Sequence, residues 1–253
     1  MAEISNNMEE YVSVALDIGE KMLISGAEIS RVEDTIERIC VAYGSVNTHV
    51  FTVTSGIIVT AFGADGICAT QLRRIKTMKF NLHKLDLLNQ LSRDICNKLP
   101  TPSEVTKMIC EIDNVPVYSF KLQTFAYFFI SGAFSVFFGG SARDMIAASF
   151  TGIVMCLVER YLGRMKMDGI FTYFACSLLG GLCNVFFVRI GLGENFALTS
   201  MGNIMLFIPG IAMTNAVRDM FQGDTLSGIS RLVSAITLAL IVTFGFTVTG
   251  VLV

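Results

Sequence analysis

Hydrophobic residues are distributed differently in the two halves of this 253-residue chain. In the first half they recur at helix or strand spacing among charged residues, whereas from Leu122 onward they form long uncharged runs. A helix needs about 20 apolar residues to cross a bilayer. We therefore predict five transmembrane helices, near residues 122–142, 144–163, 169–188, 195–217 and 232–253.

The second predicted span is the shortest, because only 14 residues between Asp144 and Glu159 lack charge. Arg160 and Arg164 can lengthen it by extending their charged ends to the membrane surface. Basic residues follow this span and flank the loop after the fourth span, at Arg160, Arg164, Lys166, Arg218 and Arg231, whereas only Arg143 and Arg189 lie on the other side. The positive-inside rule then places the N-terminal part in the cytoplasm and Val253 outside.

The first 116 residues have the pattern of an α+β domain. Helices are predicted from Tyr11 to Ser25, from a candidate capping box at Ser30 to Gly44, from Asn81 to Lys98 and from Ser103 to Ile112. Three β-like runs, Val46–Val53, Ile57–Phe62 and Ile67–Ile75, are separated by glycine-containing turns and predict an antiparallel meander. The predicted fold is an α-helical membrane bundle, residues 117–253, that follows a cytoplasmic α+β domain, residues 1–116.

Composition removes several classes of function. Hydrophobic residues make up 53% of the chain and charged residues 16%, and the net charge is −2 without a basic block, which removes the electrostatic case for nucleic-acid binding. The seven cysteines are odd in number and none has CxxC spacing, so we predict no zinc site, other metal or cofactor. The two histidines, His49 and His83, belong to no recognisable catalytic motif, so we predict no catalytic residue and no enzyme.

Small and polar residues mark the predicted spans. Small residues recur every fourth position at Ser131, Ser135 and Gly139 and again at Cys176 and Gly180, a spacing that lets helices approach closely. Asn184 continues the second series and places an amide at mid-span depth, where it needs a polar partner or a water-filled cavity.

The fourth span contains the strongest functional signal. Pro209 lacks a backbone donor and Gly210 follows it, so the helix should kink or break there. Freed backbone groups at membrane depth are tolerated against protein or a polar cavity, as in transporter binding sites. Polar residues lie on both sides of this point, at Asn203, Thr214, Asn215, Arg218 and Asp219, and form the candidate substrate path.

Three strings, SGAEISRVEDTIERI, PGIAMTNAVRD and GDTLSGISRL, resemble the threonine/serine exporter family. The resemblance covers nearly the whole chain and is closest to the N-terminal half of the split form. It implies export of amino acids such as threonine and serine, or of dicarboxylates such as succinate, from a bacterial inner membrane. It also marks Asp224 as a site residue and implies a second small membrane subunit that completes the transporter.

Two hypotheses follow. The first is a subunit of a secondary-active exporter that binds a small metabolite within the lipid bilayer, with a separate membrane subunit as partner and a homo-oligomer as the alternative. The second is a membrane-anchored hydrolase or ligand sensor whose chemistry lies in residues 1–116. Because no nucleotide-binding loop is present, an exporter would be driven by an ion gradient, with Asp219 or Asp224 as proton carrier.

Overall fold

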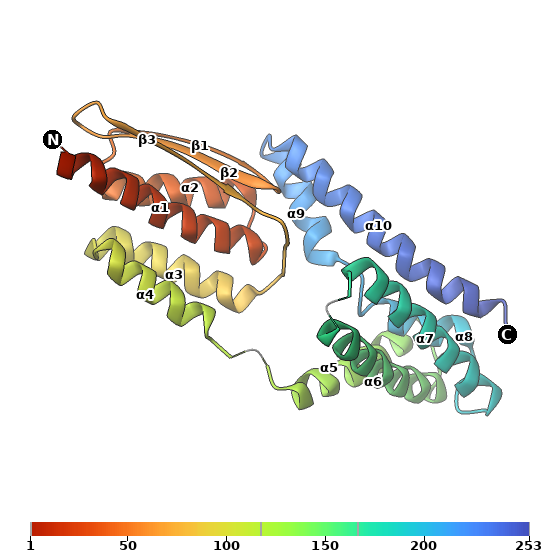
Figure 1. Cartoon of the computed structure of the whole chain (residues 1–253). Helices are drawn as coiled ribbons and strands as arrows, with labels where there is room; N and C mark the ends of the chain where they lie inside the picture. The colour runs from red at the N-terminus through yellow and green to blue at the C-terminus, as the bar shows by residue number, and fades with distance from the viewer. Residues whose placement is uncertain (1, 117, 166, 253) are drawn as a thin grey trace. The chain divides into compact units, whose positions relative to one another are not determined.

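The computed structural model describes residues 2–116, 118–165 and 167–252. These residues form a mostly helical chain with one small sheet (Figure 1). The elements are α1 (Ala2–Ile24), α2 (Ile29–Ala42), β1 (Asn47–Val53), β2 (Gly56–Phe62), β3 (Cys68–Arg74), α3 (Leu82–Lys98), α4 (Pro102–Asp113), α5 (Phe120–Phe137), α6 (Ala142–Arg164), α7 (Gly169–Arg189), α8 (Phe196–Ile204), α9 (Gly210–Phe221) and α10 (Thr225–Gly250).

The chain folds into two compact units. Unit 1 comprises residues 1–116 and 211–232, and unit 2 comprises residues 117–210 and 233–253. Unit 1 therefore contains most of α9 and the first turns of α10, in addition to the N-terminal elements. The sequence-based boundary at residue 116 remains a prediction of domain organisation.

The sheet of unit 1 is the predicted antiparallel meander, in the order β1-β2-β3. Ile57, Val59 and Ala61 alternate along β2 and bury one face of the sheet. Helices α1 and α2 cover this face, and α3 and α4 pack against α1 as a further layer (Figure 1). The resulting core is continuous across the sheet and all four helices.

Capping chemistry sets several helix boundaries in unit 1. The Asn81 side chain accepts a hydrogen bond from Lys84 N at 3.0 Å, and Thr101 and Glu104 form a capping box that starts α4. The capping box predicted at Ser30 is wrong. Helix α2 begins one residue earlier, at Ile29, and its N-cap is Glu28.

Unit 2 consists of α5 to α8 and the apolar part of α10, packed through small residues. Ser131 and Ser135 are fully buried, and a Cβ at Gly202 of α8 would lie 2.4 Å from the Ser131 carbonyl oxygen. Only glycine permits this close approach of α5 and α8. Gly139 does not share in the packing, because it lies beyond the end of α5 with a positive φ of 96°.

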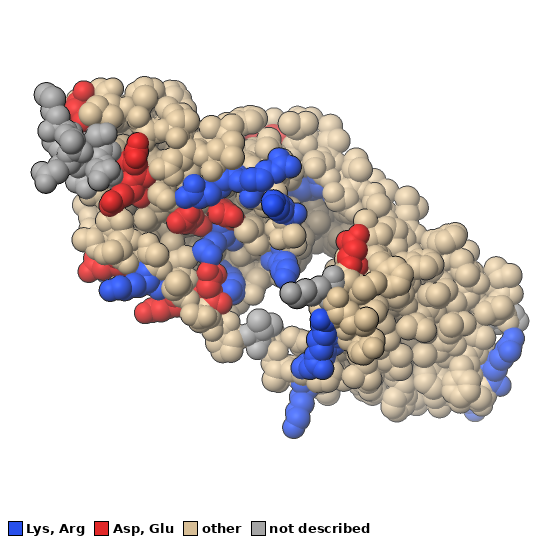
Figure 2. Space-filling model, viewed as in Figure 1, with Lys and Arg blue, Asp and Glu red and all other residues tan. Residues whose placement is uncertain are grey.

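Three of the described helices are long and apolar enough to cross a membrane: α6, α7 and α10. Figure 2 shows charged side chains gathered over unit 1, whereas the visible face of unit 2 is largely uncharged. Large apolar side chains of unit 2, including Phe129, Phe137 and Phe186, are exposed, as expected for contact with lipid. The full set of five spans remains a prediction.

Candidate functional site

The predicted helix break at Pro209 is confirmed. Helix α8 ends at Ile204 and α9 begins at Gly210, with Pro209 immediately before the new helix. Phe207 fixes the connecting segment within unit 2, because its buried ring packs against Tyr173 with the ring centroids 5.3 Å apart. The chain thus leaves one helix and starts another within a stretch whose apolar character alone would predict a single span.

Unit 2 contains a buried cluster of amides and hydroxyls on α6, α7 and α8. Asn184 Oδ1 accepts hydrogen bonds from Thr151 Oγ1 at 2.8 Å and from Asn203 Nδ2 at 3.2 Å. Asn184 Nδ2 donates to Ser200 Oγ at 3.1 Å. The structure therefore brings the two predicted amides, Asn184 and Asn203, into direct contact, with both fully buried.

This cluster has unused hydrogen-bonding capacity. Among the described residues, Asn203 Oδ1 has no hydrogen-bond partner, and the hydroxyls of Ser131 and Ser135 on neighbouring α5 also have none. Buried polar atoms are normally satisfied. The cluster can therefore accept water or a polar ligand without breaking a contact within the protein.

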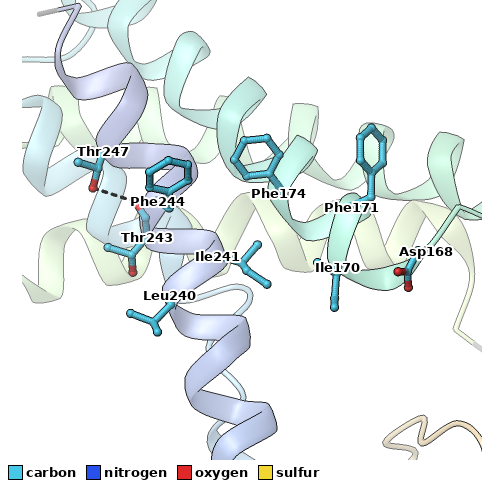
Figure 3. A pocket seen from close by; sticks show the side chains of 9 residues that line it. All are labelled: Asp168, Ile170, Phe171, Phe174, Leu240, Ile241, Thr243, Phe244 and Thr247. Carbon is cyan, nitrogen blue, oxygen red and sulfur yellow. Dashed lines mark hydrogen bonds between the residues drawn. The ribbon is translucent and has the colours of Figure 1, made fainter.

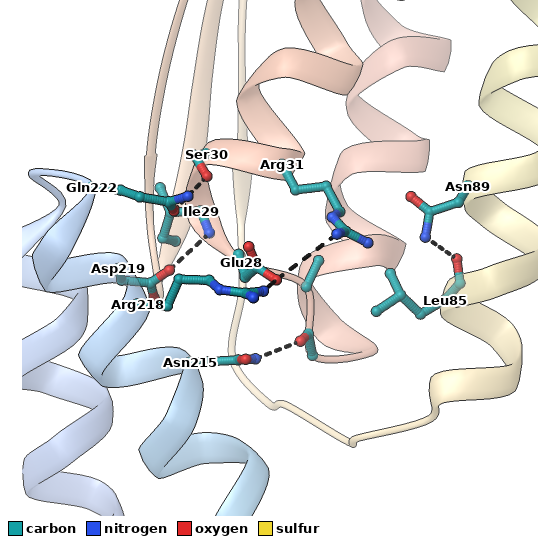
Figure 4. Close-up of polar contacts among 12 residues, drawn as sticks. Glu28, Ile29, Ser30, Arg31, Leu85, Asn89, Asn215, Arg218, Asp219 and Gln222 are labelled. Carbon is teal, nitrogen blue, oxygen red and sulfur yellow. Dashed lines mark hydrogen bonds and ion pairs between the residues drawn. The ribbon is translucent and has the colours of Figure 1, made fainter.

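In unit 1, α9 is hydrogen-bonded to the loop between α1 and α2 (Figure 4). Asn215 Nδ2 donates to the Gly26 carbonyl at 2.8 Å, and Asp219 Oδ1 accepts from Ile29 N at 3.2 Å. Gly26 has φ of 99°, a left-handed conformation that glycine adopts without a Cβ penalty. Two of the motif strings, around residues 25–30 and 215–219, are thus contact partners within one fold.

Asp219 forms a buried ion pair with Arg231 of α10. Asp219 Oδ2 lies 3.0 Å from Arg231 Nε, and the two side chains are 0% and 3% exposed. The pair is a close charge contact without hydrogen-bond geometry, whereas Arg231 Nη2 donates to the Ala27 carbonyl at 2.8 Å. Arg231 Nη1 has no hydrogen-bond partner in the described part of the chain, so a buried donor remains available.

Arg231 is the main residue that the sequence reasoning missed, since it was used only as a marker of orientation. The available signal was its position in the string SGISRL, where a basic residue precedes a long uncharged run. Burial raises the pKa of the Asp219 carboxyl, although the Ile29 amide and the Arg231 guanidinium oppose this shift.

Arg218 projects from α9 to Glu28, with which it forms an ion pair. Together with Thr214 it lines a shallow cavity of about 580 Å³. Glu28 is also 4.0 Å from Arg31, so one carboxylate faces two guanidinium groups.

Asp224 lies between α9 and α10 and is half-buried. Burial raises its pKa, and the Asp224 charge in turn contributes to the raised pKa of Glu33 in α2. Glu33 accepts a hydrogen bond from Thr52 N at 2.7 Å. These two carboxyl groups are therefore better able to hold a proton than exposed acids are.

Five of the predicted site residues consequently form two groups. Asn184 and Asn203 belong to the amide cluster of unit 2, and Asn215, Arg218 and Asp219 contact the α1–α2 loop in unit 1. Pro209 and Gly210 lie where α8 ends and α9 begins in the chain, and the negative charge of Asp224 helps to raise the pKa of the Glu33 carboxyl.

Two further cavities are present, one in each unit. In unit 1, a polar cavity of about 610 Å³ lies between α2 and α3. In unit 2, an apolar groove of about 770 Å³ is lined by α7 and α10, including Phe171, Phe174 and Phe244 (Figure 3).

Comparison with known proteins matches residues 13–253 to the family described as putative threonine/serine exporter. The threonine/serine exporter of Corynebacterium glutamicum is 21% identical over 87% of this chain and 46% of its own length, so the chain spans about half of that protein. A Klebsiella aerogenes protein named probable succinate transporter subunit YjjP is 24% identical over 86% of this chain and 85% of its own length. No solved structure matches the chain. Because the family match covers nearly the whole sequence, the chain belongs to the threonine/serine exporter family.

Proposed function

We propose that this chain is one subunit of a secondary-active exporter of small hydrophilic metabolites that carry a carboxylate. Its family and the names of its relatives support a membrane exporter, and point to a transporter instead of an enzyme. The relatives' names indicate two substrate classes, amino acids such as threonine and serine and dicarboxylates such as succinate.

The observation that carries the proposal is the interrupted helix pair α8–α9 with buried polar groups on both sides of the interruption. Interrupted helices in transporters present unpaired backbone groups and helix ends to a substrate. Here Asn203 precedes the interruption and Asn215 follows it. Both side chains are buried amides, and burying an amide costs free energy unless it forms hydrogen bonds.

Arg231 supplies the positive charge that a carboxylate substrate requires. Its Nη1 donor is unused in the described residues, and Asp219 beside it can compensate the charge when substrate is absent. A substrate carboxylate would add a charge-assisted hydrogen bond to this buried guanidinium. Arg218, on the same helix as Asp219, is a second cation, and its side chain is more exposed than that of Arg231.

We assign proton coupling to Asp224. Asp219 is engaged by Arg231 and by the Ile29 amide, whereas burial favours the protonated form of Asp224. A carboxyl group at the membrane edge that gains and loses a proton is a suitable carrier for gradient-driven export.

The proposed arrangement has five spans in the bacterial inner membrane, with residues 1–116 in the cytoplasm and the C-terminus outside. Helices α6, α7 and α10 are the three apolar spans, and α5 and residues 195–217, which contain the interruption between α8 and α9, would supply the other two. The basic residues around the loops support this orientation.

A second membrane subunit would complete the transporter. An odd number of spans leaves the two ends of one chain on opposite faces, and transporters pair such halves in inverted orientation. The word subunit in the name of the Klebsiella relative supports this arrangement. The aromatic groove between α7 and α10 offers a surface for a partner helix, with a second copy of this chain as the alternative.

Substrate counterflow in proteoliposomes tests the function. Asn215→Ala removes the amide that bonds the Gly26 carbonyl and should lower counterflow of threonine or succinate at least tenfold when protein insertion is unchanged. Asn47→Ala, at an exposed amide of β1, is the matched control and should retain wild-type rates. Wild-type rates in the inserted Asn215 variant would contradict the proposal.

A further inference from the structure

The polar cavity between α2 and α3 lies outside the candidate transport site. Its charged lining consists of three arginines and two aspartates, Arg31, Arg38, Arg93, Asp34 and Asp86. Asn89, Asn97 and Ser92 add neutral polar groups. The formal charge of the lining is +1, and its volume of about 610 Å³ is sufficient for a small metabolite.

The arginines of this cavity differ in how they are paired. Arg38 Nε is held by Asp34 Oδ1 at 2.8 Å, so its charge is compensated. Arg31 has only a long contact, 4.0 Å from Glu28. Arg93 makes no hydrogen bond or ion pair within residues 2–116, 118–165 and 167–252. Two guanidinium groups on facing helices therefore lack a close anion.

We propose that this cavity binds a small dicarboxylate as a regulatory ligand, with Arg31 and Arg93 each holding one carboxylate. Each planar guanidinium matches a carboxylate with two parallel hydrogen bonds. The aspartates within the lining disfavour highly charged anions such as polyphosphates, because their negative charges would repel them. Two separate cations favour a ligand with two anionic groups over a single phosphate ion.

The cavity is connected to α9 through one carboxylate (Figure 4). Glu28 Oε1 faces Arg31 on the cavity side and also pairs with Arg218 of α9. A ligand carboxylate that pairs with Arg31 replaces Glu28 as its partner, so Glu28 then pairs with Arg218 alone. Ligand occupancy would thereby strengthen the contact between the α1–α2 loop and α9.

This inference deepens the proposed function, because it makes the cytoplasmic dicarboxylate concentration a regulator of the helix that follows the interruption. The coupling is reciprocal, so a change at Arg218 must also alter ligand affinity. We therefore expect Arg218→Gln, which leaves Glu28 free to hold Arg31 more firmly, to weaken dicarboxylate binding.

Calorimetric titration of the full chain in detergent micelles tests the proposal, with succinate as the probe and inorganic phosphate as the comparison. Arg31→Gln and Arg93→Gln should each weaken succinate binding about tenfold or more, because each removes a bidentate ion pair. Arg74→Gln removes the same charge from an exposed position on β3 outside the cavity and should change affinity less than about twofold.

Asn47→Ala, at an exposed position of β1 outside both the cavity and the candidate transport site, should leave succinate affinity within about twofold of the wild type. Binding that is lost in the Asn47 variant but retained in both arginine variants would overturn the proposal. Equal affinities for phosphate and succinate, or no binding at millimolar succinate, would also overturn it. Arg93→Lys keeps the charge but loses the planar fork, so it should bind weakly even if the glutamine variant fails to fold.

The two proposals can fail separately. If export fails although succinate binding depends on Arg31 and Arg93, only the exporter assignment is wrong. If export proceeds but binding is indifferent to both arginines, only the regulatory cavity is wrong.

Discussion

Neutralising Asp219 should destabilise unit 1, because it leaves Arg231 buried without its counter-ion. Asp219→Asn keeps an oxygen that can accept the Ile29 N–H hydrogen bond, so the change removes charge with little change in shape. At 3.0 Å, two unit charges attract by about 5.5 kcal/mol with an effective dielectric constant of about 20. The cost of burying the charges offsets much of this attraction, but removing one partner of a buried pair still costs about 3–5 kcal/mol.

The loss can be measured by thermal unfolding of the full chain in detergent, followed by far-ultraviolet circular dichroism because the chain has no tryptophan. A protein of this size loses about 2–4 °C in Tm for each kcal/mol, so Tm should fall by about 6–20 °C. Asp94→Asn is the matched control. It breaks an exposed pair, 3.2 Å from Lys98, and should shift Tm by less than about 2 °C.

The double variant Asp219→Asn with Arg231→Gln provides the critical comparison. Removing both charges should recover most of the loss, because neither charge is then buried alone. Equal Tm shifts for the Asp219 and Asp94 variants would refute the reasoning. So would a double variant whose loss equals the sum of the two single losses.

Three further changes test the transport account. Pro209→Ala restores a backbone donor and favours a continuous helix, so export should fall in a correctly inserted protein; unchanged export would mean that the interruption has no transport role. Arg218→Gln should lower succinate export more than Arg189→Gln, and equal effects in liposome assays would remove the privileged role of Arg218. Because burial raises the pKa of Asp224, this carboxyl loses its proton at a higher pH than an exposed aspartate does. Asp224→Asn should abolish the corresponding pH dependence of export, together with proton-driven export, while substrate counterflow continues. Gradient-driven export by the Asp224 variant would mean that another group carries the proton.

Local sequence chemistry was sufficient to predict most elements. The β-like run Ile57–Phe62 between glycine-containing turns predicted the central strand, and the predicted helix start at Asn81 proved to be the N-cap of α3. The interruption at Pro209 was also predictable, because a residue without a backbone donor disrupts a helix whatever surrounds it. The capping box at Ser30 did not form because the Ile29 N–H at the start of α2 is bonded by Asp219 of α9 and the Ser30 hydroxyl donates to Gln222, both far away in sequence.

The candidate site was predictable only in part. Asn215 and Asp219 could be recognised as unusual in an apolar stretch, but their partners Gly26 and Ile29 lie 189 and 190 residues away in sequence. Such contacts depend on how α9 packs in the folded chain, and the spacing of hydrophobic residues along the sequence does not specify that packing. For the same reason Arg231 was interpreted as a loop charge, although it is buried against Asp219.

Transport by defined proteoliposomes tests the central claim most directly. The chain should be reconstituted alone and together with a candidate second membrane subunit, and export of radiolabelled succinate and threonine should be measured with an imposed proton gradient. The account predicts substrate-specific, gradient-dependent export only when both subunits are present, and its loss with Asn215→Ala. Robust export by this chain alone would contradict the need for a partner, and the absence of export of either substrate class by the reconstituted pair would contradict the exporter function.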